Sequence, residues 1–421
     1  HPNARLGELR TLKTRRNARL DGHVAFLRLP SGADRVVYDP VAVRSAPVTR
    51  GKLVLAALAA LVLAAACGLP QARPTPSPKP SPTPTPQPVV AIVQPGSPKD
   101  VLRLVSLDGR EVARTLIPQG APIAGVGGQQ VGFVDRDVLR ALRSDGQVVQ
   151  LGTLAGFKAG SRVVMSPDGK QWLWSTSKQQ GDGLHSVLYL NNTLLADSTE
   201  PDRVLQPVTW TKKGPIVEHA VVGAGGYQLF DVTSGPAELL NTQTGGRTPL
   251  TDGSCLFAAL ADDGAVACRV PGPSFATTTA LQITPSGGQP VNVPMPADRM
   301  TQIGGISFRP GQASMLALGG SPAKAASSGG QGEVYESDVV DVASAALRPF
   351  GQPGLRPGDG QWAWLPNGTL ICYRPANAAG GDPGVYIVQV GGAAQQLTPS
   401  GRPVGVLMSS SSGGQGSASQ I

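Results

Sequence analysis

The chain has 421 residues, including 54 Gly and 39 Pro, with 5% aromatic and 15% charged residues and a formal net charge of +8. The first 66 residues hold 11 Lys and Arg against 4 Asp and Glu, which leaves 25 basic and 24 acidic residues in the remainder. A surface that binds nucleic acid needs clustered cations to displace counterions from phosphates. The near-neutral remainder therefore excludes nucleic acid as an expected partner.

The N-terminal part has the pattern of a secretory signal. Residues 1–47 contain no methionine, while 48–66 combine a basic flank (Arg50-Gly51-Lys52) with 14 apolar residues at 53–66. Fourteen helical residues rise about 21 Å, whereas a membrane-spanning helix needs roughly 20 residues. We predict a cleaved signal peptide at 48–66. We assign 1–47 to upstream translation or an unstructured extension, the alternative being a cytosolic extension of a membrane-anchored protein.

The residues that end this segment suggest lipidation. Leu63-Ala64-Ala65-Ala66-Cys67-Gly68 resembles the lipobox of bacterial lipoproteins, although Ala64 stands where that family usually has Leu. The resemblance implies that Cys67 receives diacylglycerol and becomes the new N-terminus. The alternative is an ordinary signal peptide cut at an A-x-A site. We therefore expect a lipid anchor in the cell membrane, with the protein facing the extracytoplasmic side.

A proline-rich stalk follows the cysteine. Residues 67–88 have proline at nearly every second position from Arg73 onward. Proline restricts itself and its predecessor to extended conformations, so the segment should form polyproline II of about 3.1 Å per residue. Such a stalk would hold the following domain away from the membrane.

Residues 89–409 contain short alternating strands separated by glycine turns, repeated at a loose period of roughly 40 to 60 residues. In each repeat an apolar anchor precedes a turn glycine, with Asp or Asn before the glycine in three repeats. The turn residues are Asp168, Gly169, Gly214, Asp263, Gly264, Gly311, Asn367 and Gly368. Four strands per repeat predict an all-β protein, a β-propeller of seven blades, with six as the alternative.

Two details of this propeller follow from the strand pattern. The first unit, 89–118, lacks an inner strand, so Pro403–Met408 should complete it and close the ring. In the fourth unit we expect Gly226–Val232 and Glu238–Asn241 as third and fourth strands. We expect the tail, 410–421, to be disordered because it is rich in Ser and Gly.

One repeat resembles a known family. The segment Met165–Ser175 (MSPDGKQWLWS) is similar to the S-P-D-G-K turn of WD-like repeats in TolB-type and dipeptidyl-peptidase-type bacterial propellers. The resemblance implies the propeller fold, and in such repeats the Asp-Gly turn is structural.

Catalytic motifs are absent from the sequence after the stalk. His185 and His219 are its two histidines, and no G-x-S-x-G, C-x-x-C or H-x-x-x-H occurs. We therefore predict no catalytic residues, no cofactor and no metal site, and a structural role for both histidines. Calcium in the loop at Asp262-Asp263 is the one alternative.

The bulky and sulfur-containing residues have structural interpretations. The five tryptophans, which include Trp174 and Trp362, should pack between blades; the alternative is that Trp172, Trp210 and Trp364 form a ligand platform. Cysteines Cys255 and Cys268 flank one hairpin and should form a disulfide in an exported protein. Cys372 is then a buried thiol.

These observations predict a monomeric, non-enzymatic binding or assembly module for a protein or envelope ligand. The alternative is an envelope lyase or hydrolase with a carboxylate-based site in the propeller funnel. Carboxylates from several blades would favour the enzyme, whereas a funnel lined by Gly, Ser and apolar residues would favour the binding module.

Overall fold

The computed structural model describes residues 87–223, 228–274, 276–322, 334–350, 353–358, 364–365, 367–389 and 393–409. The signal peptide, Cys67, most of the stalk, Trp362 and the tail lie outside the described residues. Gln87 and Pro88, expected to end the stalk, already belong to the first strand.

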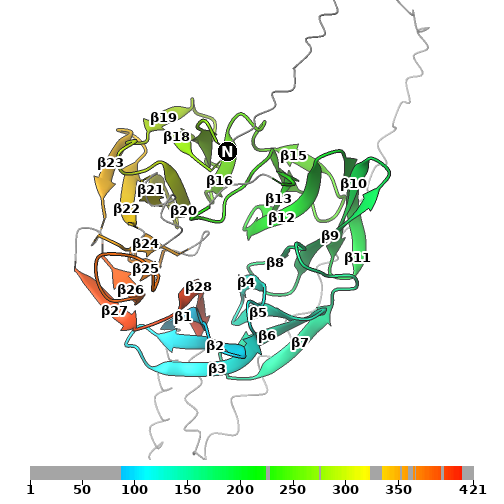
Figure 1. The fold of residues 1–421 in the computed structure, drawn as a ribbon, viewed down its shortest axis with the longest axis horizontal. Helices are drawn as coiled ribbons and strands as arrows, with labels where there is room; N and C mark the ends of the chain where they lie inside the picture. The colour runs from blue at the N-terminus through cyan, green and yellow to red at the C-terminus, as the bar shows by residue number, and fades with distance from the viewer. Residues whose placement is uncertain are drawn as a thin grey trace, which may run out of the picture. The chain divides into compact units, whose positions relative to one another are not determined.

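The described chain folds as seven antiparallel sheets of four strands each, arranged around a central axis like the blades of a propeller (Figure 1). The seven-bladed β-propeller predicted from the sequence is thus confirmed. Blade 1 contains β28 (Arg402–Ser409), β1 (Gln87–Gln94), β2 (Lys99–Ser106) and β3 (Glu111–Pro118). Blade 2 contains β4 (Ile123–Gly127), β5 (Gln130–Asp135), β6 (Val138–Arg143) and β7 (Val148–Thr153). Blade 3 contains β8 (Val163–Met165), β9 (Trp172–Gln180), β10 (Gly183–Leu190) and β11 (Thr193–Glu200).

The other four blades repeat this order, each starting from its inner strand. Blade 4 contains β12 (Arg203–Thr211), β13 (Gly214–Val221), β14 (Ala237–Leu240) and β15 (Arg247–Pro249). Blade 5 contains β16 (Leu256–Leu260), β17 (Val266–Pro271), β18 (Thr278–Thr284) and β19 (Val291–Pro294). Blade 6 contains β20 (Gln302–Arg309), β21 (Gln312–Ser321), β22 (Glu336–Asp341) and β23 (Ala346–Pro349). Blade 7 contains β24 (Arg356–Pro357), β25 (Leu370–Arg374), β26 (Gly384–Val388) and β27 (Ala394–Thr398).

The ring closes in blade 1 by pairing the two ends of the domain. Strand β28 lies antiparallel beside β1, from Gln87 opposite Ser409 to Val93 opposite Arg402, and Figure 1 shows the red strand beside the blue one. The closing strand predicted from Pro403–Met408 is therefore confirmed. Strand β28 thus takes the innermost place in blade 1, so β1 is paired on both sides and the blade has four strands like the others.

The core consists of apolar clusters between successive blades. Strand alternation explains this arrangement, since side chains two apart point to the same face of a sheet. On β1, Val89 and Ala91 pack with blade 2, whereas Val90 and Ile92 pack with blade 7. Each blade thus buries both faces, which explains why its strands are rich in apolar residues.

The repeat turns adopt the conformation for which glycine is suited. Asp168 accepts hydrogen bonds from the Ser166 hydroxyl at 2.6 Å and the Lys170 amide at 3.1 Å, so its side chain organises the turn before Gly169. Asn367 and Asp263 accept equivalent bonds from backbone amides two residues later. The turn glycines have positive φ: 73° at Gly169, 135° at Gly214, 105° at Gly264, 71° at Gly311 and 81° at Gly368.

One strand expectation is wrong. In blade 4, β14 is the third strand and β15 the fourth, so the expected third strand at Gly226–Val232 does not exist within the described residues 228–232. Residues 228–236, which we call the strap, connect β13 to β14 without regular structure. Their sequence is apolar enough to resemble a strand, but these residues contact other blades instead of pairing with a neighbouring strand.

Candidate functional site

A cavity of about 440 Å³ lies at one end of the inner strands of the described domain. Strands β4, β8, β12, β16, β20 and β28 contribute to its wall, together with the strap. We call it the funnel. It is the candidate functional site because it is concave and combines apolar walls with a few charged groups.

The strap is held against blades 5 and 6. The Thr233 hydroxyl donates a hydrogen bond of 2.6 Å to the Phe257 carbonyl on β16, and the Leu229 amide donates one of 3.0 Å to the Gln302 side chain on β20. Phe230 packs closely over Gly304, where an added Cβ would overlap the phenyl ring. Glycine at this position of β20 therefore allows the strap to approach the sheet.

Blade 7 holds the strap through a buried arginine. Arg356 donates a 2.6 Å hydrogen bond to the Leu229 carbonyl, and its guanidinium carbon lies 4.2 Å from the Phe230 ring centroid. The rings of Tyr335 and Tyr373 lie 5.2 and 5.0 Å from the same carbon. Three aromatic rings thus stabilise the buried cation and fix the strap by cation–π contacts.

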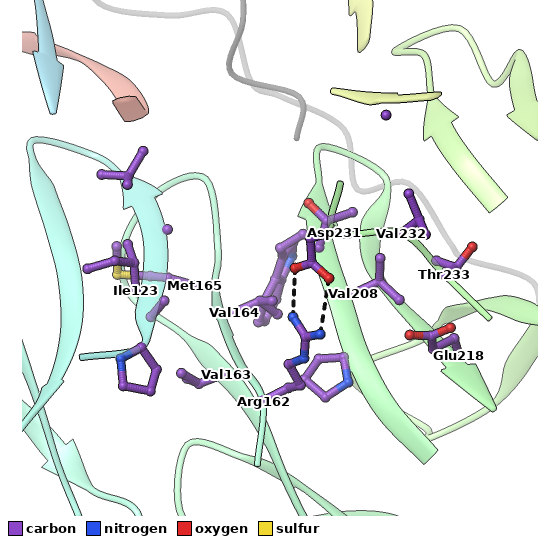
Figure 2. Close-up of a pocket in the computed structure, with 18 of the residues that line it drawn as sticks. Ile123, Arg162, Val163, Val164, Met165, Val208, Glu218, Asp231, Val232 and Thr233 are labelled. Atoms are coloured by element: carbon purple, nitrogen blue, oxygen red, sulfur yellow. Dashed lines mark hydrogen bonds and ion pairs between the residues drawn. The ribbon is translucent and has the colours of Figure 1, made fainter. Parts of the chain in front are cut away.

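The strap contacts blade 3 through an ion pair at the funnel wall. Arg162, next to β8, donates hydrogen bonds of 2.8 and 3.1 Å to the two carboxylate oxygens of Asp231, as Figure 2 shows. This pairing raises the pKa of Arg162. The two side chains are 49% and 63% exposed, so the pair is open to solvent.

A second carboxylate, Glu218 on β13, is buried in the funnel wall. It accepts hydrogen bonds from the Gln206 side chain at 3.0 Å and the Ser234 amide at 2.9 Å. Burial raises the pKa of Glu218, and these two hydrogen bonds oppose the shift. Both oxygens therefore already have donors within the protein.

A buried cation, Arg269 on β17, also lines the funnel and is 1% exposed. It donates hydrogen bonds of 3.2 Å to the Thr278 hydroxyl and 2.9 Å to the Thr233 carbonyl. Burial lowers the pKa of Arg269 to about 10, and the charge of Glu218 opposes that shift. Arg269 thus anchors the strap to blade 5 and balances the charge of Glu218.

Sequence analysis did not identify these four charged residues. They are Arg162, Glu218, Asp231 and Arg269. One signal was present: Arg269 stands within the apolar strand sequence AVACRV, and a charged residue in a buried strand requires a partner.

The proposed tryptophan platform is largely buried. Trp210 and Trp364 are 6% and 4% exposed and border a second hollow of about 420 Å³, at the hairpin end of the inner strands. The Trp364 indole donates a 3.0 Å hydrogen bond to the Ser307 carbonyl. Trp172 packs against Gly152 of blade 2 and lies outside this hollow. Little ring surface is available for stacking on a ligand.

Neither histidine faces the funnel. His185 contacts the Thr199 hydroxyl at 3.0 Å across two strands of blade 3. His219 contacts Glu200 of blade 3 through Nδ1 and lies 3.2 Å from Glu238 through Nε2, so it links blades 3 and 4. Among the described residues no group of three His, Cys, Asp or Glu side chains has a metal-binding arrangement. In the loop considered for calcium, Asp262 pairs with Lys212 at 2.7 Å.

The three cysteines after the stalk occupy two environments. Cys255 and Cys268 form a disulfide that links the start of blade 5 to β17, the pair expected from the hairpin. Cys372 on β25 is a free, fully buried thiol between blades 6 and 7, and burial raises the pKa of Cys372 to about 12.

Comparisons with known proteins give fold similarity only. No protein-family profile and no curated protein sequence matches the chain. A TolB-type protein from Agrobacterium tumefaciens aligns at 11% identity and a TM-score of 0.38, covering 63% of this chain and 88% of that one. Oligogalacturonate lyase from Vibrio parahaemolyticus aligns at 12% identity with a TM-score of 0.45, and the alignment covers 71% of this chain and 91% of that one. Prolyl oligopeptidase B from Galerina marginata aligns at 8% identity with a TM-score of 0.42, and the alignment covers 71% of this chain and 44% of that one. At such identities no activity transfers to this chain.

The described residues contain no helix long and apolar enough to cross a membrane.

Proposed function

We propose that the protein is a lipid-anchored, extracytoplasmic binding module whose funnel takes a ligand without chemically changing it. The observation that supports this proposal is which blade supplies the carboxylates of the funnel. Within the described residues both of them, Glu218 and Asp231, come from blade 4, and both accept hydrogen bonds from protein donors. The remaining wall is mostly glycine, proline and aliphatic side chains.

Catalysis by a lyase or hydrolase requires an acid and a base that can reach a bound substrate. Glu218 is buried and accepts hydrogen bonds from Gln206 and Ser234, which leaves Asp231, paired with Arg162, as the exposed carboxylate among the described residues of the funnel. The alternative envelope enzyme would need carboxylates that converge from several blades. The funnel therefore favours binding over catalysis.

The strand order supports a tethered role. The chain enters the propeller at Gln87, which pairs with Ser409 at the C-terminal end of β28. Arg402, at the other end of the same strand, lines the funnel, whereas Met408 lines the second hollow. Gln87, where a stalk from an acylated Cys67 would join the domain, thus lies at the end of blade 1 opposite the funnel.

Blocking the funnel tests the binding role. Thr209 lines the funnel and is partly exposed, so Thr209→Trp should fill it, while Gln312→Trp places the same bulk at the second hollow. The full chain carrying each substitution is used for affinity capture from envelope extract. We expect Thr209→Trp to lose the specific ligand and Gln312→Trp to retain it. Equal capture by both variants and the parent contradicts a binding role for the funnel.

The anchor is tested separately. Labelled fatty acid fed to an expressing bacterium should enter the parent protein and be absent from the Cys67→Ser variant. Equal labelling of the two proteins contradicts acylation at Cys67.

A further inference from the structure

Three arginines and two carboxylates line the funnel: Arg402, and two pairs of opposite charge at different depths. Arg162 and Asp231 lie at its surface in direct contact, while Glu218 and Arg269 are buried in its wall. The charge of Glu218 acts on both arginines. Charges of opposite sign are thus present together, so a ligand that carries only one sign meets a like charge in the site.

The exposed pair can exchange partners at small energetic cost. Ion pairs that are about half exposed contribute little to stability because water screens their charges. The Arg162 guanidinium presents a planar fork that matches a carboxylate, and its present partner already uses two parallel bonds. A ligand carboxylate can therefore take the place of Asp231 on Arg162, which frees Asp231 for a ligand cation.

Apolar side chains flank this pair. Ile123 and Val208 line the funnel, and Figure 2 shows them on opposite sides of the Arg162–Asp231 pair. The volume of about 440 Å³ is in the range of small-ligand sites, about 300 to 1,000 Å³. The site therefore suits a small ligand with apolar groups and both a carboxylate and an ammonium group.

We propose that the funnel binds short zwitterionic peptides, with the ligand carboxylate on Arg162, the ligand ammonium on Asp231, and the apolar side chains between Ile123 and Val208. This inference rests on the proposed binding function and names the ligand class. No covalent step is involved.

Calorimetric titration of the full chain with the dipeptide L-leucyl-L-leucine tests the proposal. N-acetyl-leucyl-leucine, which lacks the cation, and leucyl-leucine amide, which lacks the anion, are the matched probes. Each lost charge-assisted contact should weaken binding on the order of tenfold. Arg162→Gln and Asp231→Asn should each weaken dipeptide binding to the same extent, whereas Lys212→Gln, in the exposed pair at the second hollow, should not.

Three results overturn the proposal: no dipeptide binding at millimolar concentration, equal binding of the blocked dipeptides, or unchanged binding by both funnel variants. Thermal melts check that each variant is folded. If dipeptide binding fails while capture from extract still depends on Thr209, the ligand class alone is wrong. If Thr209→Trp also leaves capture unchanged, the proposed function is wrong.

Discussion

Closure of the ring by β28 predicts that the C-terminal strand holds a large share of the stability. Deleting residues 402–421 removes the strand, whereas deleting 410–421 removes only residues after it. The first deletion exposes the inner edge of β1 and uncovers the blade faces that Leu407 and its neighbours cover. We expect a large loss of stability for the first deletion and almost none for the second.

The structure sets the size of the effect. Leu407 is 2% exposed between blades 1 and 2, Val404 packs in the same cluster, and Val406 packs between blades 7 and 1. Burial of one leucine and two partly buried valines is worth about 4 kcal/mol. A domain is typically stable by about 5 to 15 kcal/mol, so this is a substantial fraction. At about 2 °C per kcal/mol, the melting temperature should fall by about 8 °C or more.

Thermal unfolding followed by circular dichroism measures this difference. Leu407→Ala provides an intermediate variant, expected to lose about 3 kcal/mol because it leaves the strand pairing in place. If both deletions melt at the temperature of the parent, β28 does not close the ring in solution, and an open or six-bladed arrangement becomes the better description.

Three further predictions concern single residues. Gly304→Ala should destabilise the protein because the added Cβ would overlap Phe230. In urea unfolding, the free energy lost through Gly304→Ala should be smaller when Phe230→Ala is already present. An equal loss in both backgrounds contradicts the contact between the strap and β20. Burial raises the pKa of Glu200, but hydrogen bonds from His219 and Ser198 lower it, and the net shift is downward. Ionised Glu200 therefore contributes its full stabilisation above the pKa that it has in the unfolded state, and this contribution is lost as the pH falls through its pKa in the folded state. Between about pH 5 and 3 the parent should therefore lose more stability than Glu200→Gln or His219→Gln. Parallel profiles of stability against pH refute this. Cys372 should resist maleimide at pH 8 until the protein unfolds, because burial raises its pKa to about 12; mass spectrometry showing rapid native labelling contradicts its placement.

The blade architecture was predictable because its signals are local. An Asp or Asn before a glycine specifies a hairpin within a few residues, as at Asp168-Gly169 and Asn367-Gly368. Repetition of that hairpin, with two further strands each time, then limits the fold to an array that must bury both faces of each unit. Even the closing strand followed from counting, since the first unit lacked one strand and the end of the domain had one extra.

The strap and the charged residues that it brings into the funnel were not predictable, because their contacts are distant in sequence. The Leu229 amide binds Gln302, 73 residues away, and its carbonyl binds Arg356, 127 residues away. Locally, Leu229, Phe230 and Val232 give the strap the apolar content of a strand, so tertiary contacts overrode the local pattern. The Gly304-Gly305 pair within β20 was a usable signal, because glycine inside a strand often marks the close approach of another backbone.

The strap also explains how a nearly regular ring acquires a single asymmetric site. Its contacts with blades 5, 6 and 7 are buried and involve backbone hydrogen bonds and aromatic rings, whereas it contacts blade 3 through the exposed pair of Arg162 and Asp231. Opening that pair would therefore leave the strap anchored by its stronger contacts. A ligand can then compete for Arg162 without paying for a rearrangement of the fold, which is the condition for a largely pre-formed binding site. The charged pair thus lies where the strap has an exposed contact, and both of its side chains are open to solvent.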